Sequence, residues 1–127
     1  LYVVKILSLH AETEILNLLH LILVRAGYEH LYTSDPQAAL AILRHEHIDL
    51  FIQNLMRPQI NGCEFYQIMQ NDEKLRDMRV LIVSALNPTL VPETCFDMIN
   101  KLYPDHYLLM PFSPQVLVKT VQRILAE

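Results

Sequence analysis

Short, mostly apolar runs alternate with longer amphipathic segments along almost the whole chain, and this alternation constrains the fold more than any other feature of the sequence. Residues 50–53 and 80–84 are two of these runs, and their length and apolar content are typical of buried strands. Between the runs, apolar residues recur at the spacing of an amphipathic helix. A repeated strand–helix order predicts a parallel sheet with helices on both faces. We therefore expect one three-layer, doubly wound α/β domain with a five-stranded sheet over residues 1–127.

Helix-capping residues mark several of the expected boundaries. Gly27 follows the last apolar position of the first helix, where glycine commonly ends a helix. Asp35 and Ser113 each stand before a proline, and a capping side chain followed by a first-turn proline starts a helix. The expected strands are 2–9, 29–33, 50–53, 80–84 and 107–109, and the helical residues expected to face inward are Ile15, Leu18, Leu19, Ile22 and Ala26, then Phe65, Ile68 and Met69, then Phe96, Ile99 and Leu102, and finally Leu117, Val121 and Ile124.

The charge balance excludes two classes of partner. The formal net charge is −4 at pH 7, and the Lys and Arg residues form no cluster. Nucleic acids and anionic membranes both bind basic patches, so the domain by itself should bind neither. No apolar run is long enough to cross a membrane, and no signal-peptide pattern is present.

The two cysteines, Cys63 and Cys95, belong to no metal-binding or redox motif. Two isolated cysteines do not predict a disulfide-stapled scaffold, so we expect reduced thiols and a cytoplasmic location. The chain begins with Leu1 instead of methionine, which is expected of a domain excised from a longer, multidomain protein.

The ends of the predicted strands are the first places to look for a site. In open parallel sheets, ligands bind outside the carboxyl ends of the strands, where the strand order reverses. The residues at these ends are His10 and Ala11, Asn54, Ser84 and Ala85, and Met110 and Pro111.

Several short blocks, in the right order, carry a family resemblance. They are Asp49-Leu50, Leu55-Met56-Arg57-Pro58, Asn61-Gly62, Ser84-Ala85 and Tyr107-Leu108-Leu109-Met110-Pro111-Phe112. With these blocks the chain resembles a response-regulator receiver domain (CheY-like) over nearly its whole length. The resemblance implies a sheet of strand order 2-1-3-4-5 and a cis peptide bond between Met110 and Pro111.

The same resemblance locates the residues of the family's reaction, and four of them are replaced. The positions of the acidic pair and the phospho-accepting aspartate hold His10, Ala11 and Asn54, and the position of the lysine holds Met110. Mg²⁺ prefers carboxylate oxygens, and an amide is a poor nucleophile because its lone pairs are delocalised. A phosphoryl group would also find no cation. We expect no catalytic residue, no metal and no cofactor in this chain.

Two further family positions are kept. By the resemblance, Ser84 is the hydroxyl that hydrogen-bonds a phosphoryl group, and Tyr107 is the aromatic switch residue. We therefore expect a pseudo-receiver: a non-enzymatic module of two-component signalling that acts through protein contacts, with a protein partner or an output domain of the same chain, or as a homodimer. Two surfaces are candidates, the face of the fourth and fifth helices with Tyr103 and Tyr107, and the first helix with Leu16, Leu21, Leu23 and Val24.

Other interpretations of the strand ends stay open. The pocket of His10, Asn54, Ser84 and Met110 could bind a small neutral or aromatic molecule. His10 could ligate a copper-like ion with Met110 and Met56, or act as a general base, but it has no second catalytic group at suitable spacing. Loss at four positions together favours natural divergence over a single introduced change at Asn54.

Overall fold

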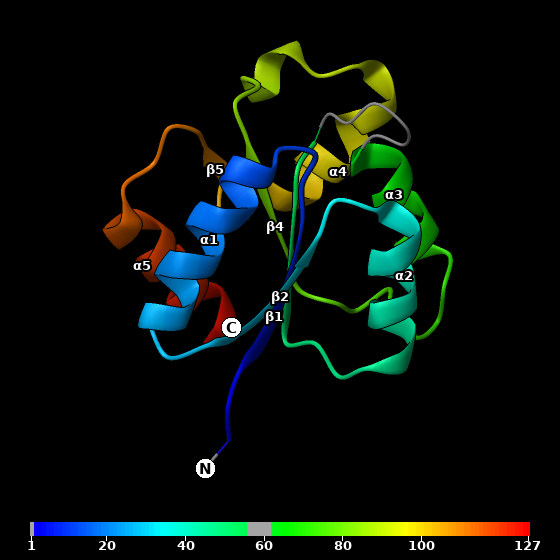
Figure 1. Cartoon of the computed structure of the whole chain (residues 1–127). Helices are drawn as coiled ribbons and strands as arrows, with labels where there is room; N and C mark the ends of the chain where they lie inside the picture. Colours follow the sequence, from blue (N-terminus) through cyan, green and yellow to red (C-terminus); the bar gives the residue numbers. More distant parts are fainter. Residues whose placement is uncertain (1, 56–61) are drawn as a thin grey trace.

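The computed structural model describes residues 2–55 and 62–127 of the chain and contains one parallel sheet (Figure 1). Its order is β2-β1-β3-β4-β5, as the resemblance implies. Every pairing is parallel, from Lys5 opposite Glu29 to Ser84 opposite Leu109. The strands are β1 (Lys5–Leu9), β2 (Glu29–Thr33), β3 (Leu50–Gln53), β4 (Val80–Ser84) and β5 (Tyr107–Leu109).

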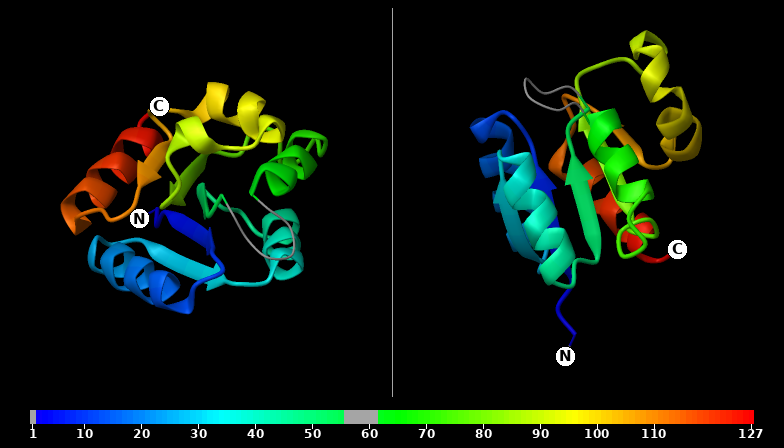
Figure 2. Two further views of the ribbon diagram at one scale, coloured as in Figure 1. Left: turned by 90° about the horizontal axis from the view of Figure 1, so that it is seen from above. Right: turned by 90° about the vertical axis from the view of Figure 1, so that its right-hand side faces the viewer.

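Helices cover both faces of the sheet and create two separate cores (Figure 2). Helices α1 (Thr13–Arg25) and α5 (Pro114–Leu125) cover one face, and their core includes Leu19 and Val121. Helices α2 (Pro36–His45), α3 (Gly62–Gln70) and α4 (Phe96–Leu102) cover the other. Two single-turn 3₁₀ helices, η1 (Pro88–Leu90) and η2 (Glu93–Cys95), precede α4. The three-layer, doubly wound α/β fold predicted from the sequence is confirmed.

The predicted helix caps are present. The Asp35 carboxylate accepts a hydrogen bond from the Gln37 amide at 3.1 Å, and the Ser113 hydroxyl accepts one from the Val116 amide at 3.1 Å. Gly27 follows α1 with a φ of 96°, a conformation that glycine adopts at no steric cost. Within the described part of the chain, no helix has the length and apolar character needed to cross a membrane.

The predicted inner face of α1 was rotated from the observed one. Leu18 and Ala26, predicted to face inward, are exposed, whereas Leu16 and Leu23, assigned to the outer surface, are buried. Apolar residues surround almost the whole helix, so their spacing did not single out one stripe.

Two smaller errors occur in α3 and α4, and both have the same cause. Ile68 and Phe96 are 36% and 51% exposed, and the positions that face inward in their place include Tyr66 and Met98. Each helix is short, so shifting the apolar stripe by one or two residues fits the sequence nearly as well. Residues 56–61, which include part of the blocks that carry the family resemblance, lie outside the described residues.

Candidate functional site

The strand ends named from the sequence meet at one edge of the sheet. The Asn54 amide donates to the Leu9 carbonyl at 3.1 Å, which places the residue after β3 beside the end of β1. The Met110 amide donates to the Ser84 carbonyl at 2.8 Å, so β4 and β5 end side by side. The structure therefore gathers the predicted site residues along the carboxyl edge, and the Met110–Pro111 peptide bond is cis, as predicted.

His10 is a buried, structural residue in this arrangement. It is 1% exposed, and its Nδ1 accepts a hydrogen bond from the Glu12 amide at 3.1 Å. A ring nitrogen that accepts a hydrogen bond carries no proton, so this contact requires a neutral imidazole. His10 thus shapes the turn between β1 and α1, at the position where the family resemblance places a metal-binding carboxylate.

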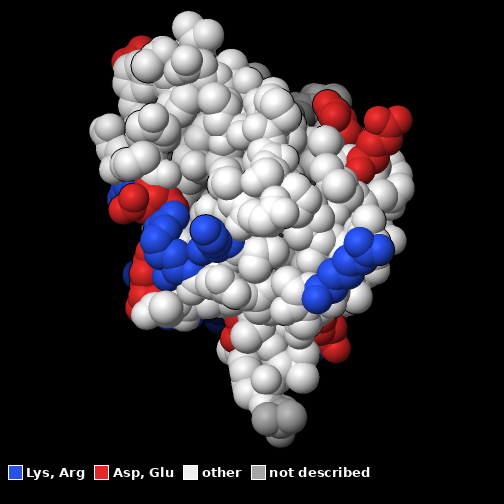
Figure 3. Space-filling model, turned by 90° about the vertical axis from the view of Figure 1, so that its left-hand side faces the viewer, with Lys and Arg blue, Asp and Glu red and all other residues white. Residues whose placement is uncertain are grey.

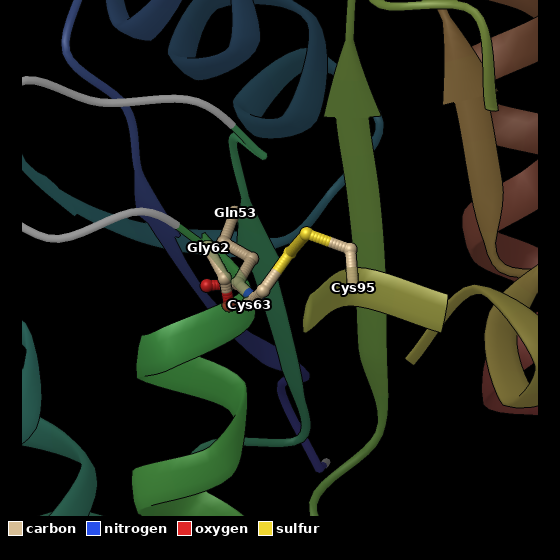
Figure 4. The surroundings of a disulfide bond; sticks show 4 residues. All are labelled: Gln53, Gly62, Cys63 and Cys95. Atoms are coloured by element: carbon tan, nitrogen blue, oxygen red, sulfur yellow. Dashed lines mark hydrogen bonds between the residues drawn. A yellow bond between two sulfur atoms is a disulfide. The ribbon is translucent and has the colours of Figure 1, made fainter. Parts of the chain in front are cut away.

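Asn54 is held where the start of α3 approaches the end of β3. The Gly62 amide donates to the Leu55 carbonyl at 2.6 Å, and the Gln53 side-chain amide donates to the Gly62 carbonyl at 3.3 Å (Figure 4). A Cβ atom at Gly62 would overlap the backbone carbonyl oxygen of Asn54 and would lie 2.9 Å from the Leu55 Cα. Only glycine allows this close approach, so Gly62 lets α3 begin directly against the backbone of Asn54 and Leu55.

Ser84 and Tyr107, the predicted switch residues, converge on one backbone segment. The Ser84 hydroxyl accepts a hydrogen bond from the Leu86 amide at 3.0 Å, and the Tyr107 hydroxyl donates to the Leu86 carbonyl at 2.5 Å. Tyr107 is 7% exposed, and this burial raises the pKa of its hydroxyl above the ordinary value. The Tyr103 ring packs edge-on against it with 5.7 Å between ring centres. The segment after β4 is therefore bonded to an inward-facing tyrosine.

The donor set at this edge does not fit Mg²⁺. An imidazole, a methyl group and an amide occupy positions 10, 11 and 54, whereas Mg²⁺ takes oxygen ligands that usually include carboxylates. Across residues 2–55 and 62–127, no cluster of three or more His, Cys, Asp or Glu side chains could hold a metal ion. The copper-like site proposed for His10 and Met110 included Met56, which lies outside the described residues.

A disulfide bond joins Cys63 to Cys95, and the prediction of reduced thiols was wrong in this structure (Figure 4). Their Cα atoms are 5.2 Å apart, within the usual disulfide range. The bond links the first turn of α3 to η2 and is buried, with Cys63 2% and Cys95 0% exposed. The two residues are 32 positions apart in the chain, so no local motif announces a pairing that only the folded chain creates.

A histidine pair on the other half of the sheet was also missed. His30 on β2 lies 3.0 Å from His20 on α1, measured between their Nδ1 atoms, and its Nε2 is 2.7 Å from the Ser8 hydroxyl. Burial, reinforced by the charge of His20, lowers the pKa of His30 to about 4. The Tyr32 ring stacks on His30 with 5.6 Å between ring centres. His30 is thus a neutral, hydrogen-bonded part of the core near neutral pH.

Three of the hollows on the described surface lie away from this edge. The largest lies between α1 and α5, and two smaller ones lie between α3 and the segment of η2 and α4. None of these three is lined by His10, Asn54, Ser84 or Met110. A small-molecule site at those four residues stays a prediction.

Sequence comparison decides the family. The profile of the response regulator receiver domain matches residues 6–122. The chain belongs to the response-regulator receiver family. One relative of this receiver domain is the probable transcriptional regulator ycf27 of Porphyra purpurea, 32% identical over 123 residues that cover 95% of this chain and 47% of that protein. Another is the alkaline phosphatase synthesis transcriptional regulatory protein PhoP of Bacillus subtilis, 29% identical with 95% and 48% covered. The receiver domain thus spans about half the length of these relatives.

Solved structures share the receiver fold. Chemotaxis protein CheY4 of Vibrio cholerae has a TM-score of 0.82 at 23% identity, covering 97% of this chain and 99% of that chain. A CheY-like receiver domain protein of Methanospirillum hungatei JF-1 has a TM-score of 0.83 at 24% identity, covering 98% and 95%. At these identities the likeness establishes the fold alone.

Proposed function

We propose that this receiver domain transmits signals through protein contacts, independently of aspartyl phosphorylation. One observation carries the proposal: the carboxyl edge of the sheet offers an imidazole, a methyl group, an amide and a thioether at His10, Ala11, Asn54 and Met110. Phosphoryl transfer to a side chain needs a nucleophile and positive charge to stabilise the developing negative charge. None of these four side chains carries a positive charge, and the one nucleophilic group, the His10 imidazole, is 1% exposed with its Nδ1 bonded to the Glu12 amide. We therefore propose that the domain is not an enzyme.

The hydrogen bonds of the predicted switch residues, Ser84 and Tyr107, support a signalling role. Ser84 and Tyr107 both bond to the backbone of Leu86, so a change in the segment after β4 is coupled to the position of this buried tyrosine of β5, which packs against Tyr103. A partner that binds this region better in one arrangement than in another would shift their populations. Protein binding can therefore replace a phosphoryl group as the input.

The relatives and the net charge support a choice of partners. The relatives are named as transcriptional regulators and are about twice as long as this chain, which supports an output domain on the same polypeptide. We propose that this domain contacts such a domain, a separate protein or a second copy, and does not itself bind nucleic acid or membranes. A transcriptional output domain on the same polypeptide would also support a cytoplasmic location.

Magnesium binding tests the proposal. Thermal unfolding should show no Mg²⁺-specific stabilisation of the natural sequence at about 10 mM Mg²⁺, with Na⁺ at equal ionic strength as the control. The variant His10→Asp, Ala11→Asp, Asn54→Asp restores the carboxylates, and a dissociation constant of about 1 mM would stabilise it by about 1.4 kcal/mol. Saturable, Mg²⁺-specific stabilisation of the natural sequence would contradict the proposal.

A further inference from the structure

The Cys63–Cys95 disulfide lies beside the two smaller hollows of the described surface. Cys63 lines both of them, and Cys95 lines neither. One, with a volume of about 360 Å³, lies between the start of α3 and η2, and the other, of about 140 Å³, lies farther along α3 and α4. Figure 4 shows the bond running from the first turn of α3 to η2. A thiol that enters either hollow therefore meets Cys63 before Cys95.

The compartment of the protein bears on what this bond does. Glutathione and dithiol reductases keep most cytoplasmic thiols reduced, and the disulfides that occur in the cytoplasm are usually transient or redox-sensing. A location in the cytoplasm, as proposed above, therefore favours a bond that opens and closes over a permanent cross-link. The hollows at Cys63 provide the access that such exchange requires.

Acidic side chains surround this access. Glu64 and Glu93 line the larger hollow, Asp97 lines both, and Lys101 lines the smaller. Within residues 2–55 and 62–127, neither Glu93 nor Asp97 forms an ion pair. The face of α1 and α5 differs, because Figure 3 shows it as a broad uncharged surface with Lys and Arg groups on either side. An anionic thiolate such as glutathione is repelled at these hollows, whereas a thiol beside positive charge is attracted.

The two ends of the disulfide are held differently. At the α3 end, the Gly62 amide donates to the Leu55 carbonyl at 2.6 Å, and the Gln53 side chain donates to the Gly62 carbonyl at 3.3 Å. These bonds anchor the turn that carries Cys63 to the end of β3. At the other end, η2 has three residues, and among the described residues no side chain caps its start. We expect η2 to be the part that moves when the bond opens.

The segment that contains η2 begins at the switch residues described above. In residues 87–95 only Val91 and Cys95 are buried. Cys95 is thus one of two anchors for the segment that follows Leu86, whose backbone bonds to both switch residues. Opening the disulfide removes the covalent part of this anchor, and a segment with few buried contacts then gains local freedom.

We propose that the Cys63–Cys95 bond is a reversible thiol–disulfide exchange site. A dithiol reductant with positive charge beside its thiols attacks at Cys63, and opening of the bond shifts the η1–η2 segment and the contacts of Leu86 with Ser84 and Tyr107. This inference rests on the proposed function, because it supplies an input that replaces phosphorylation.

The exchange is a balanced two-electron step. The thiolate sulfur of the reductant bonds to the Cys63 Sγ, and the bond between Cys63 and Cys95 breaks with its electron pair on the Cys95 Sγ, which takes up a proton. The second thiol of the reductant then attacks the reductant's own sulfur in the mixed disulfide and releases the Cys63 thiolate, which is also protonated. Two electrons and two protons pass to this chain, and the reductant leaves as a disulfide. An oxidised dithiol reverses both steps.

Single-cysteine variants test where the exchange begins. Cys95→Ser leaves the Cys63 thiol and Cys63→Ser leaves the Cys95 thiol, and circular dichroism checks that both are folded. N-ethylmaleimide should label Cys63 at least about tenfold faster than Cys95 in the folded variants, because access limits the reaction of buried thiols. The two rates should be equal in denaturing urea. Equal rates in the folded variants, or faster labelling of Cys95, would overturn the assignment.

Charged thiols test the role of the acidic side chains in the natural sequence, which keeps its disulfide. Cysteamine is cationic and 2-mercaptoethanesulfonate is anionic, and each rate is divided by the rate of the same thiol with the neutral bis(2-hydroxyethyl) disulfide. At about 20 mM salt, cysteamine should open the bond at least about fivefold faster, and the ratio should fall toward one at about 0.5 M NaCl because salt screens the charges. A ratio of one at low salt would contradict the proposal.

Matched charge variants separate the hollows from the net charge. Glu93→Gln, Asp97→Asn should lower the ratio about threefold, because it removes two of the carboxylates that line the hollows. Glu14→Gln, Glu73→Gln removes the same charge elsewhere and should leave the ratio unchanged. Equal effects of the two double variants would assign the preference to the net charge and overturn the role of the hollows.

Amide NMR of the natural sequence, with and without a phosphine reductant, tests the coupling to the switch residues. Reduction should shift the resonances of Leu86 and Tyr107 as well as those near the two cysteines, and should leave α1 and α5 unchanged. Changes confined to the neighbours of the cysteines would overturn the coupling. Failure of these tests would leave the absence of phosphorylation untouched, and phosphoryl labelling of the natural sequence would leave the thiol measurements untouched. The two proposals therefore fail independently.

Discussion

Reduction of the Cys63–Cys95 disulfide should lower the free energy of unfolding by about 4 kcal/mol. The bond closes a loop with a sequence separation of 32 residues. For a loop of this length, the chain-entropy relation predicts that the cross-link lowers the conformational entropy of the unfolded chain by about 12 cal/mol/K, which stabilises the folded state by about 3.7 kcal/mol at 298 K. Single domains of this size have total stabilities of about 5–15 kcal/mol, so the loss would be readily measured.

The reason lies in both states of the chain. In the folded state Cys63 and Cys95 are buried against the core of α3, α4 and the sheet, so two reduced thiols can keep most of this packing. In the unfolded state the free chain regains the conformations that the cross-link removed. The loss should therefore appear as a lower denaturation midpoint with native secondary structure retained.

Urea unfolding followed by far-ultraviolet circular dichroism, with and without a phosphine reductant, measures this difference. The Cys63→Ala, Cys95→Ala variant is the control, because its midpoint should not respond to reductant. A thiol titration of the untreated, denatured protein should find no free cysteine. Two free thiols, or a change of less than about 1 kcal/mol on reduction, would refute the reasoning.

Two other predictions concern the backbone beside Asn54 and the buried histidine. Gly62→Ala should destabilise the fold by about 1–3 kcal/mol in urea unfolding, because its Cβ would overlap the Asn54 carbonyl. The control is Gly27→Asn, which should destabilise the fold less, because position 27 has a φ of 96° and open space around it. Equal losses of stability in the two variants would contradict this account. The folded-state pKa of His30 is lowered to about 4, so the folded state holds the neutral ring. The contribution of this neutral ring to the free energy of unfolding is fully present above the unfolded pKa of about 6.5 and is lost as pH falls toward 4. Stability should fall by about 2 kcal/mol between about pH 7.5 and pH 5, and an unchanged pH dependence in His30→Gln would disprove this origin.

Local signals were enough to predict most of the fold. Asp35, Ser113 and Gly27 identified helix boundaries because a cap is formed by residues adjacent in sequence. The inner face of α1 was not determined, because apolar residues such as Leu18 and Leu23 lie all around that helix and only its packing on the sheet selects one side.

Site residues could be predicted from the sequence where their position depends on the strand order, and could not where they depend on contacts between distant parts of the chain. His10 and Asn54 could be named from the sequence because strand ends in a parallel sheet share one edge. The Cys63–Cys95 bond and the His30 cluster could not, because each joins residues that only the tertiary fold brings together. The resemblance supplied the strand order, which the local pattern left open.

Intact-mass spectrometry after incubation with acetyl phosphate and Mg²⁺ tests the central claim most directly. The account predicts no phosphoryl adduct of about 80 Da on the natural sequence or on Asn54→Asp, because Ala11 and Met110 still supply neither a metal ligand nor a cation. The variant His10→Asp, Ala11→Asp, Asn54→Asp, Met110→Lys restores all four groups and serves as the positive control. A hydroxylamine-sensitive adduct on the natural sequence would contradict the claim, and robust labelling of Asn54→Asp alone would contradict its explanation.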